Sequence, residues 1–255
     1  MRPLRIALVS ESASPLAPPG GVGADPLGVH VAALSRALAR RGHQVTVHTR
    51  REDTGLGEHV PLCPGVLVHH VGGGPARGAS EEKVLRHMAA FGEQLADYWI
   101  HHPPTVAHAH FWTSGLVGLP GAHYLGIPLV QTFHALAGAA AGGHRDGGGI
   151  SVSGRIAIET AVGQQADRVL STCRDELDGL RAMGVPEERI RIVPPDGDRA
   201  EPRRPRTPAR HTWHRAAWNR AAVLTELVYR EALSGPPFDR AAEDVRGGRS
   251  ASVRR

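Results

Sequence analysis

Histidines within short apolar runs are the side chains of this sequence best suited to chemistry. His108 and His110 alternate within the run at residues 105–110, so in a strand both would point to one face and could hold a metal ion. His69 and His70 form a second candidate pair. No further ligand stands at a metal-binding spacing and no H-E-x-x-H motif occurs. We therefore predict no metal site and expect packing and hydrogen-bonding roles for these histidines.

His134 differs because it directly follows the apolar run IPLVQTF at residues 127–133. If that run is a parallel strand, His134 lies at the carboxyl edge of the sheet, where ligands bind. A neutral imidazole there can donate to, or accept from, a sugar hydroxyl, which makes His134 the candidate catalytic residue. A histidine satisfied within its own loop is the alternative.

Glycines follow the first apolar run and could border an anion. Gly21, Gly23 and Gly28 precede or begin an amphipathic stretch, so they would lie at a helix N-terminus, whose N–H groups favour phosphate. They stand too far beyond the strand for a dinucleotide fingerprint, and the second strand ends in Thr49-Arg50 instead of an acidic residue. NAD is thus disfavoured. An NADP-dependent oxidoreductase, with Arg50 at the 2′-phosphate, and a plain connecting loop stay open as alternatives.

The elements that must position these residues alternate along the chain. Apolar runs read as strands at residues 4–9, 44–49, 66–70, 105–110, 127–133, 168–172 and 188–195. Amphipathic stretches read as helices at residues 29–42, 80–99, 113–125, 151–166 and 175–183. This order predicts an α/β fold, a Rossmann-like parallel sheet of six or seven strands with helices on both faces.

Composition narrows the class of protein. Residues 1–198 carry 17 Lys and Arg against 19 Asp and Glu, a net of −2, whereas residues 199–255 carry 13 against 6, a net of +7. The basic charge is therefore confined to the tail, and with few aromatic residues it does not predict a nucleic-acid surface. No apolar run is long enough to span a membrane, and only two cysteines occur. We expect a cytoplasmic protein with reduced thiols.

The chain changes character near its end. We predict a Rossmann-like domain over residues 1–198, a Pro/Arg-rich linker over 199–210, an amphipathic helix over 211–235 and a disordered tail over 236–255. The apolar stripe expected to bury this last helix consists of Trp213, Ala217, Leu224, Leu227 and Val228.

Five blocks of sequence together resemble one family. They are the opening stretch RIALVSESASPL with GGVGADPLGVHVAALSRALARRGHQVTVHTR, then HAHFWTSGLVG, IPLVQTFHALAG, ADRVLSTCRDEL and GVPEERIRIVPPDGD. In content, order and spacing they resemble the N-terminal domain of retaining family-4 glycosyltransferases of GT-B architecture, especially D-inositol-3-phosphate and sucrose-phosphate-synthase-like enzymes.

The resemblance implies transfer of a sugar from a nucleotide-sugar donor to an acceptor hydroxyl, with retained configuration and without a metal or other cofactor. The acceptor would be a small sugar or sugar phosphate. His134 would contact the sugar near the reacting centre. The acceptor and phosphate side would be lined by Gly21, Gly23, Gly28, Phe111, Thr132 and Arg155.

The sequence also departs from this family. No segment after Asp198 is long enough for the second Rossmann domain that holds the donor, although HTWHRAAWNRAAVLTELVYREAL resembles the family's final, returning helix. Few basic residues follow the TFHAL block, and Glu81 stands where a lysine is expected, with Lys83 two residues on. We therefore expect a truncated, weakly active or inactive transferase. The alternative is a non-catalytic binding or regulatory module whose open cleft face docks another protein subunit.

Overall fold

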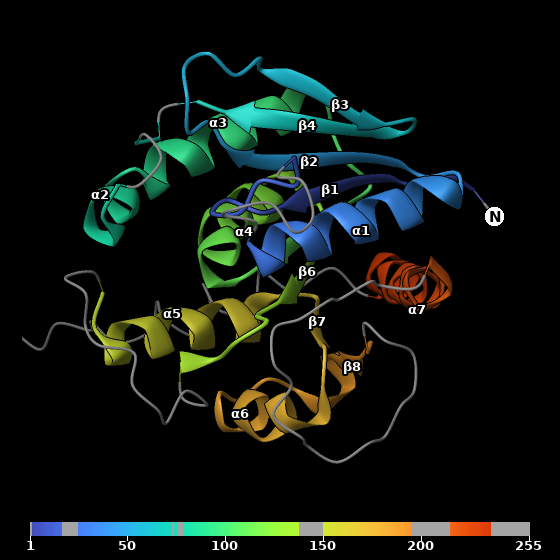
Figure 1. The fold of residues 1–255 in the computed structure, drawn as a ribbon. Coiled ribbons are helices and arrows are strands. Elements are labelled where there is room, and N and C mark those ends of the chain that lie inside the picture. The colour runs from blue at the N-terminus through green and yellow to red at the C-terminus, as the bar shows by residue number, and fades with distance from the viewer. Residues whose placement is uncertain are drawn as a thin grey trace, which may run out of the picture.

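An eight-stranded sheet forms the centre of the molecule, in the order β3-β4-β2-β1-β5-β6-β7-β8 (Figure 1). This computed structural model describes residues 2–16, 25–72, 74–75, 79–137, 150–194 and 215–235. The strands are β1 (Arg5–Val9), β2 (Gln44–Arg50), β3 (His59–Cys63), β4 (Val66–Val71), β5 (Val106–His110), β6 (Leu129–Thr132), β7 (Arg168–Ser171) and β8 (Ile190–Ile192). The predicted α/β class is confirmed.

The sheet has one more strand than expected, and that strand is antiparallel. β3 pairs with β4 as a hairpin at the edge of the sheet, whereas all the other pairings are parallel. The sequence predicted a parallel sheet of six or seven strands and did not predict this antiparallel edge strand. The sequence of β3, HVPLC, contains Pro61 and shows no clean apolar alternation, so it did not suggest a strand. An edge strand tolerates proline because only one of its sides is paired.

The strand order reverses beside β1. The chain moves outward from β1 through β2 to β4, then returns to place β5 on the other side of β1. In open parallel sheets this reversal leaves a crevice outside the carboxyl ends of the two central strands, where ligands bind. The ends of β1 and β5 therefore define where a functional site should lie.

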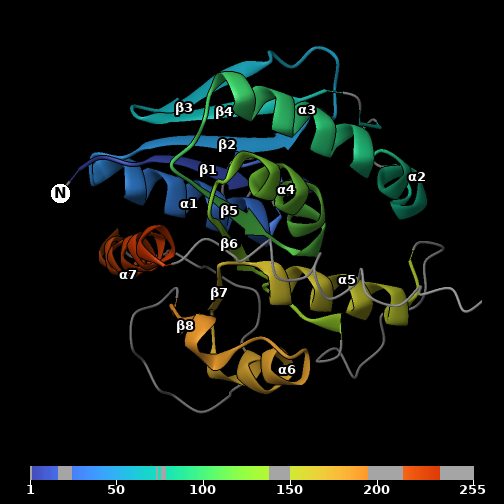
Figure 2. The same ribbon diagram turned by 180° about the vertical axis from the view of Figure 1, so that it is seen from behind.

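Helices cover both faces of the sheet (Figures 1 and 2). They are α1 (Pro26–Arg40), α2 (Glu81–Arg86), α3 (Met88–His101), α4 (Trp112–Leu125), α5 (Val152–Gln165), α6 (Leu177–Ala182) and α7 (Arg215–Ser234). One core lies under α1 and α7, and a second contains buried side chains of α3, α4, α5 and α6. Among the described helices, none has both the length and the apolar character that crossing a membrane requires.

Helix α1 begins where the sequence provides a cap. Asp25 accepts a hydrogen bond from the backbone N–H of Leu27, and Pro26 takes the first helical position. Gly28 follows in the first turn, where a Cβ atom would lie only 2.5 Å from the carbonyl oxygen of Ser14. The loop after β1 thus passes directly against the start of α1, and this close approach requires glycine.

The stretch predicted as one helix over residues 80–99 is two helices. Ser80 caps α2 as expected by accepting from the N–H of Lys83. The helix ends at His87, whose ring bonds to the Lys83 carbonyl at 2.7 Å and so satisfies a group left open by the last turn. The predicted helix over residues 175–183 begins as a 3₁₀ turn, η2 (Arg174–Glu176), before α6.

Helix α7 returns to the domain and packs beside α1. Its buried face includes Trp218 and Tyr229, which are 3% and 0% exposed. The predicted stripe was wrong at Leu227, which is 47% exposed, although Val228 is buried. Trp213, the predicted linker and the predicted tail over 236–255 lie outside the described residues.

Candidate functional site

Backbone strain marks the carboxyl edge of the sheet. Among the non-glycine residues that the structure describes, positive φ angles occur only at Phe111 (75°) and His134 (64°). Phe111 follows β5 and His134 lies two residues after β6. Its own neighbours hold Phe111 in this conformation, because its N–H donates to the Thr132 carbonyl and its carbonyl accepts from the N–H of Gly115. Strained residues of this kind cluster at functional sites, where surrounding contacts maintain them.

A buried chain of imidazoles lies at the same edge. His110 Nδ1 is 3.0 Å from His134 Nε2, and the His108 and His110 rings are 4.1 Å apart. His108 is held on both sides, by the Tyr229 hydroxyl and the Thr132 hydroxyl, each at 2.8 Å. The expectation that His108 and His110 share one face is confirmed, and the hydrogen-bonding role predicted for them is observed.

Burial keeps these histidines neutral. It lowers the pKa of His134 to about 4 and that of His108 to about 3. The pKa of His110 is also well below its usual value, first through burial and then through its neighbouring histidines. Neutral rings each carry one N–H and one lone pair, so they can both donate to and accept from hydroxyl groups. His110 Nε2 is buried, and no described residue forms a hydrogen bond with it.

The last helix reaches this cluster at two points. Trp218 packs edge-on against His30 of α1 with ring centres 4.9 Å apart, and His30 in turn lies 4.7 Å from the His134 ring. Tyr229 contacts His108 three turns further along the same helix. α7 therefore supports both ends of the histidine chain. Sequence reasoning missed His30 because it lies within α1, and the apolar pattern that predicts this helix says nothing about its polar residues.

An ion pair at the carboxyl edge of the sheet, at the ends of β1 and β2, was also missed. Glu11, just beyond β1, lies 3.3 Å from Arg50 at the end of β2, and Arg50 also pairs with Glu52 at 3.1 Å. Burial raises the pKa of the Glu11 carboxyl, and the positive charge of Arg50 opposes that rise. Both Glu11 carboxylate oxygens and the Nε and Nη1 atoms of Arg50 are buried, and within the described part of the chain they form no hydrogen bond beyond this ion pairing. The available sequence signal was Arg50, a charged residue directly after the apolar run at residues 44–49.

Arg155 and Phe111, both predicted to line the acceptor side, are in contact. The Arg155 guanidinium is 5.1 Å from the centre of the Phe111 ring. It also donates to the Glu159 carboxylate and to the Ala135 carbonyl, both at 2.7 Å. Its charge is therefore compensated by a carboxylate that is itself 1% exposed.

The other predicted residues have structural neighbours. Thr132 is buried, and its hydroxyl forms a hydrogen bond with His108 Nε2 that holds this ring in place. Gly28 contacts the loop after β1 as described above. Gly21 and Gly23 lie outside the described residues. Of the predicted set, the structure therefore brings together Phe111, Thr132, His134 and Arg155.

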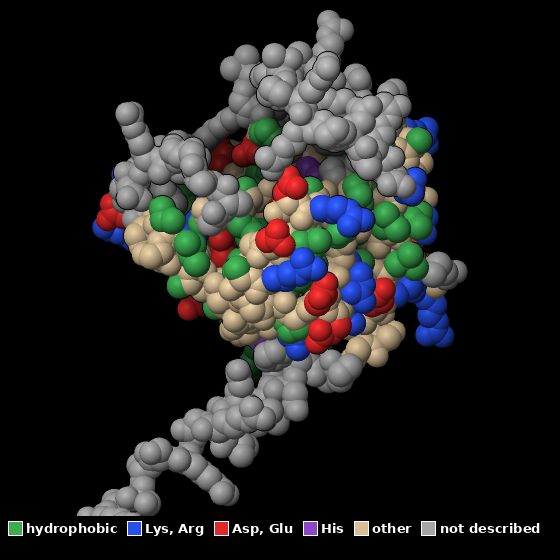
Figure 3. Space-filling model, turned by 90° about the horizontal axis from the view of Figure 1, so that it is seen from below, with side chains coloured by type: hydrophobic (Ala, Val, Ile, Leu, Met, Phe, Trp, Pro, Cys, Tyr) green, Lys and Arg blue, Asp and Glu red, His purple; other side chains and the backbone are tan. Residues whose placement is uncertain are grey.

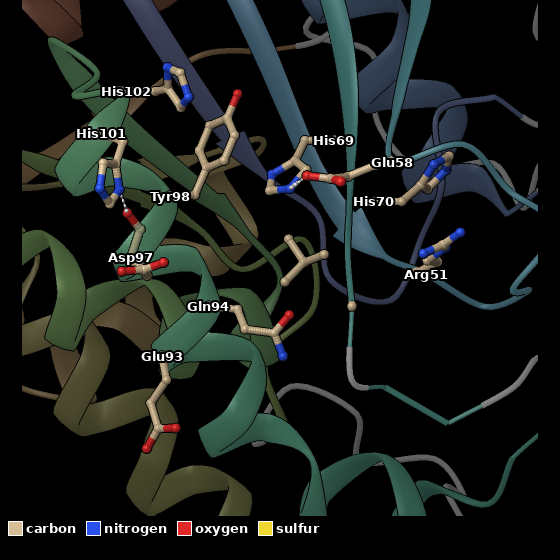
Figure 4. A pocket seen from close by; sticks show the side chains of 12 residues that line it. Arg51, Glu58, His69, His70, Glu93, Gln94, Asp97, Tyr98, His101 and His102 are labelled. Carbon is tan, nitrogen blue, oxygen red and sulfur yellow. Dashed lines mark hydrogen bonds and ion pairs between the residues drawn. The ribbon is translucent and has the colours of Figure 1, made fainter.

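A separate pocket of about 600 Å³ lies between the β3–β4 hairpin and α3 (Figure 4). Figure 4 shows His69 and Glu58 facing each other on one side, with Tyr98 and His102 across from them. The His69 ring is stacked on Tyr98 at 4.1 Å, and burial lowers the His69 pKa to about 4. This pocket is not at the strained edge.

Comparison with known proteins gives consistent matches. Residues 27–195 match the family model described as Glycosyltransferase Family 4. The D-inositol 3-phosphate glycosyltransferase of Streptomyces coelicolor is 32% identical over 198 residues, which cover 76% of this chain and 43% of the relative. D-inositol 3-phosphate glycosyltransferase 1 of Catenulispora acidiphila is 37% identical, with 77% and 47% covered. The chain spans less than half the length of these relatives.

Solved structures agree on the fold. A sucrose-phosphate synthase from Thermosynechococcus elongatus has a TM-score of 0.66 at 25% identity, covering 74% of this chain and 47% of that one. A second structure of that synthase has a TM-score of 0.63 at 21% identity; the match covers 99% of that chain and 90% of this one. The family match spans residues 27–195, more than half of the chain, and the chain therefore belongs to glycosyltransferase family 4.

Proposed function

We propose that this chain provides the acceptor-side half of a retaining sugar transfer from a nucleotide sugar to an acceptor hydroxyl. The observation that carries the proposal is the strained edge, where Phe111 and His134 occur together with the Nε2 atom of His110, which has no hydrogen-bond partner within the described ranges. A buried polar atom without a partner costs about 1–3 kcal/mol, which a bound hydroxyl would recover. The family supports the reaction class.

His134 would orient the sugar in this proposal. Since its pKa is about 4, it is neutral at physiological pH, and because its Nε2 is engaged with His110, its Nδ1 can take one role, as donor or as acceptor. A hydroxyl is the matching ligand, because it can supply either complementary role. Phe111 would cover the apolar face of the same ligand, with the Arg155 guanidinium stacked behind its ring.

Donor activation requires positive charge that the described residues of this acceptor-side half provide poorly. A leaving diphosphate must be stabilised by positive charge. Two arginines at this edge, Arg50 and Arg155, are already paired, with Glu11 and Glu159. We therefore propose weak or no transfer by this chain alone. The pairing of Arg50 also disfavours an NADP 2′-phosphate at the end of β2.

The acceptor is proposed to be a polyol, with or without phosphate. The relatives' names point to D-inositol 3-phosphate as the first compound to test. Because Arg155 is compensated, a phosphate should add little affinity through that residue. A cytoplasmic location is part of the proposal, since both cysteines, Cys63 and Cys173, are free thiols, as is usual in a reducing compartment.

The proposal is tested by binding and turnover with the full chain. Isothermal titration with D-inositol, D-inositol 3-phosphate and UDP- or GDP-sugars should show acceptor binding that His134→Ala removes. Leu227→Ala, a change at an exposed residue of α7, is the matched control and should bind normally. Mass spectrometry should find little glycosylated product. Absence of any polyol binding would reject the acceptor role, and robust turnover would reject the claim of a missing donor clamp.

A further inference from the structure

Three histidines from separate elements meet at the strained edge. His30 belongs to α1, His110 ends β5, and His134 follows β6. One ring nitrogen of each lies within 4.8 Å of the other two. The His30 plane is inclined by 80° to His134 and by 59° to His110, so the three rings do not form a single stack. We propose that His30, His110 and His134 bind one divalent first-row transition-metal ion, such as Zn²⁺ or Co²⁺.

The chemistry of the donor set selects the class of ion. The three donors are imidazole nitrogens, which suit zinc, cobalt, nickel and copper, whereas magnesium and calcium require oxygen ligands. Three histidines with a remaining open position are the arrangement of a reactive zinc site, in contrast to a closed four-ligand structural site. The fourth position would be available to water or to an oxygen of a bound ligand.

The spacing of the facing nitrogens fits a shared ion. Two nitrogens bound tetrahedrally at about 2.0–2.1 Å from zinc are about 3.3 Å apart. His110 Nδ1 and His134 Nε2 are 3.0 Å apart, so an ion could replace their hydrogen bond after a small adjustment. Both side chains are held in place by strained or strand backbone, which limits the reorganisation that binding requires.

The hydrogen-bond network also leaves the necessary tautomer accessible. Two neutral rings that share one hydrogen bond have a proton on one facing nitrogen and a lone pair on the other. An ion between His110 and His134 needs both lone pairs, so the His110 proton must reside on Nε2. That nitrogen is buried and has no partner among the residues that the structure describes, so the proton can move there without breaking a hydrogen bond within them.

A rival cluster shows the opposite situation. Glu58, His59 and His69 also bring three ligand atoms within 4.8 Å (Figure 4 shows Glu58 and His69). There the Trp99 indole donates to His48 Nε2, so neutral His48 carries its proton on Nδ1 and donates it to His69 Nδ1.

This chain of bonds fixes the His69 proton on Nε2, the atom that faces Glu58 at 4.0 Å. A metal ion would need a lone pair at that position. Binding at His69 would therefore break the buried bond from Trp99 or from His48. The two clusters have similar composition, but only the cluster at the strained edge has a free tautomeric choice.

Tag-free full-length protein, stripped with a chelator, provides the test. Co²⁺ titration followed by visible absorption and Zn²⁺ titration by calorimetry should each show one ion per chain. His134→Gln and His30→Gln should each weaken the affinity at least about tenfold, since each removes one of three ligands. His59→Gln, in the rival cluster, should leave the affinity unchanged. Zn²⁺ should also raise the melting temperature of the wild-type chain.

The outcomes separate clearly. Loss of binding in His30→Gln and His134→Gln, with circular dichroism and metal-free melting temperature like the wild type, supports the site. No cobalt spectrum in the wild type, or binding that His59→Gln abolishes and His30→Gln retains, overturns it. If one variant does not fold, the other decides. None of these readouts depends on sugar transfer, so the proposed function can fail while the metal site stands.

Discussion

A buried carboxylate fastens α7 to the end of α1, and its removal gives the sharpest test of the structure. Glu226 is 2% exposed. Its Oε2 accepts from Arg41 Nε at 2.7 Å and lies 3.2 Å from His43 Nε2, while its Oε1 accepts from Arg230 Nη2 at 2.7 Å. Glu226→Gln keeps the shape of the side chain and removes its charge.

The magnitude follows from the pKa of this carboxyl. Burial alone would raise that pKa, but the bonds from Arg230, Arg41 and His43 outweigh burial and lower it from 4.5 to about 2. Each unit corresponds to about 1.4 kcal/mol, which gives about 3 kcal/mol at full strength. Because Arg41 and Arg230 are 31% and 26% exposed, solvent screening reduces the expected loss to about 2 kcal/mol.

The pH dependence has a definite sign. A carboxyl whose folded pKa is depressed stabilises the fold fully above its unfolded pKa, and this contribution disappears as the pH falls through the folded value. The difference between wild type and Glu226→Gln should therefore be constant near neutral pH and shrink from about pH 4.5 towards pH 2.

Urea unfolding followed by tryptophan fluorescence measures this difference, with Glu231→Gln as the matched control. Glu231 is on the same helix and bonds Arg191 at 2.9 Å, but its side chain is 41% exposed, so we expect about 0.5 kcal/mol there. Equal losses in the two variants, or a Glu226→Gln deficit that persists undiminished at pH 3, would refute this account of the α1–α7 contact.

Three further predictions concern the frame of the site. Gly115→Ala should destabilise the fold by about 1–3 kcal/mol in thermal melts, since the new Cβ would lie 2.4 Å from Gln131 Oε1. Gly118→Ala on the same helix is the control: its Cβ would have its nearest neighbour at 3.6 Å, so the change should be neutral or stabilising. Tyr229→Phe should cost about 1–2 kcal/mol by leaving a buried His108 nitrogen without its partner, and a smaller loss in urea titration would contradict that bond. A stop codon after residue 198 removes α7 and should lower the melting temperature markedly; an unchanged value would mean that the helix does not hold the domain together.

The sequence predicted the fold well where local pattern and burial agree. The central strands are short apolar runs because both of their faces are covered, and the helix predicted from residue 80 begins at the capping residue Ser80. β3 escaped detection because its pairing depends on β4 and not on its own pattern. The buried face of α7 was misplaced because Glu226, a charged residue, is buried there by partners from α1 that no local pattern reveals.

The site was predicted only in part, for a related reason. His134 and Phe111 could be located because they follow strands, and the carboxyl edge of a parallel sheet is a ligand-binding edge. Their strained backbone and the approach of His30 arise from tertiary contacts. Arg155 and Glu159 are four residues apart on one helix, so their ion pair could have been inferred from the sequence. The contact of Tyr229 with His108 could not, because 121 residues separate them along the chain.

The two borders of the sheet have a consequence for how copies of the molecule meet. At one border, β3 carries Pro61 and a register irregularity between Pro61 and Cys63, both of which interrupt the regular hydrogen-bonding row of an edge. At the other, β8 is three residues long and its Arg191 side chain is tied to α7. Within the described residues neither border offers a long, flat template for another strand, so growth into β-aggregates through these borders is disfavoured. Away from the strands, Figure 3 shows Lys and Arg side chains intermixed with Asp and Glu on the face seen from below, without a large field of one sign.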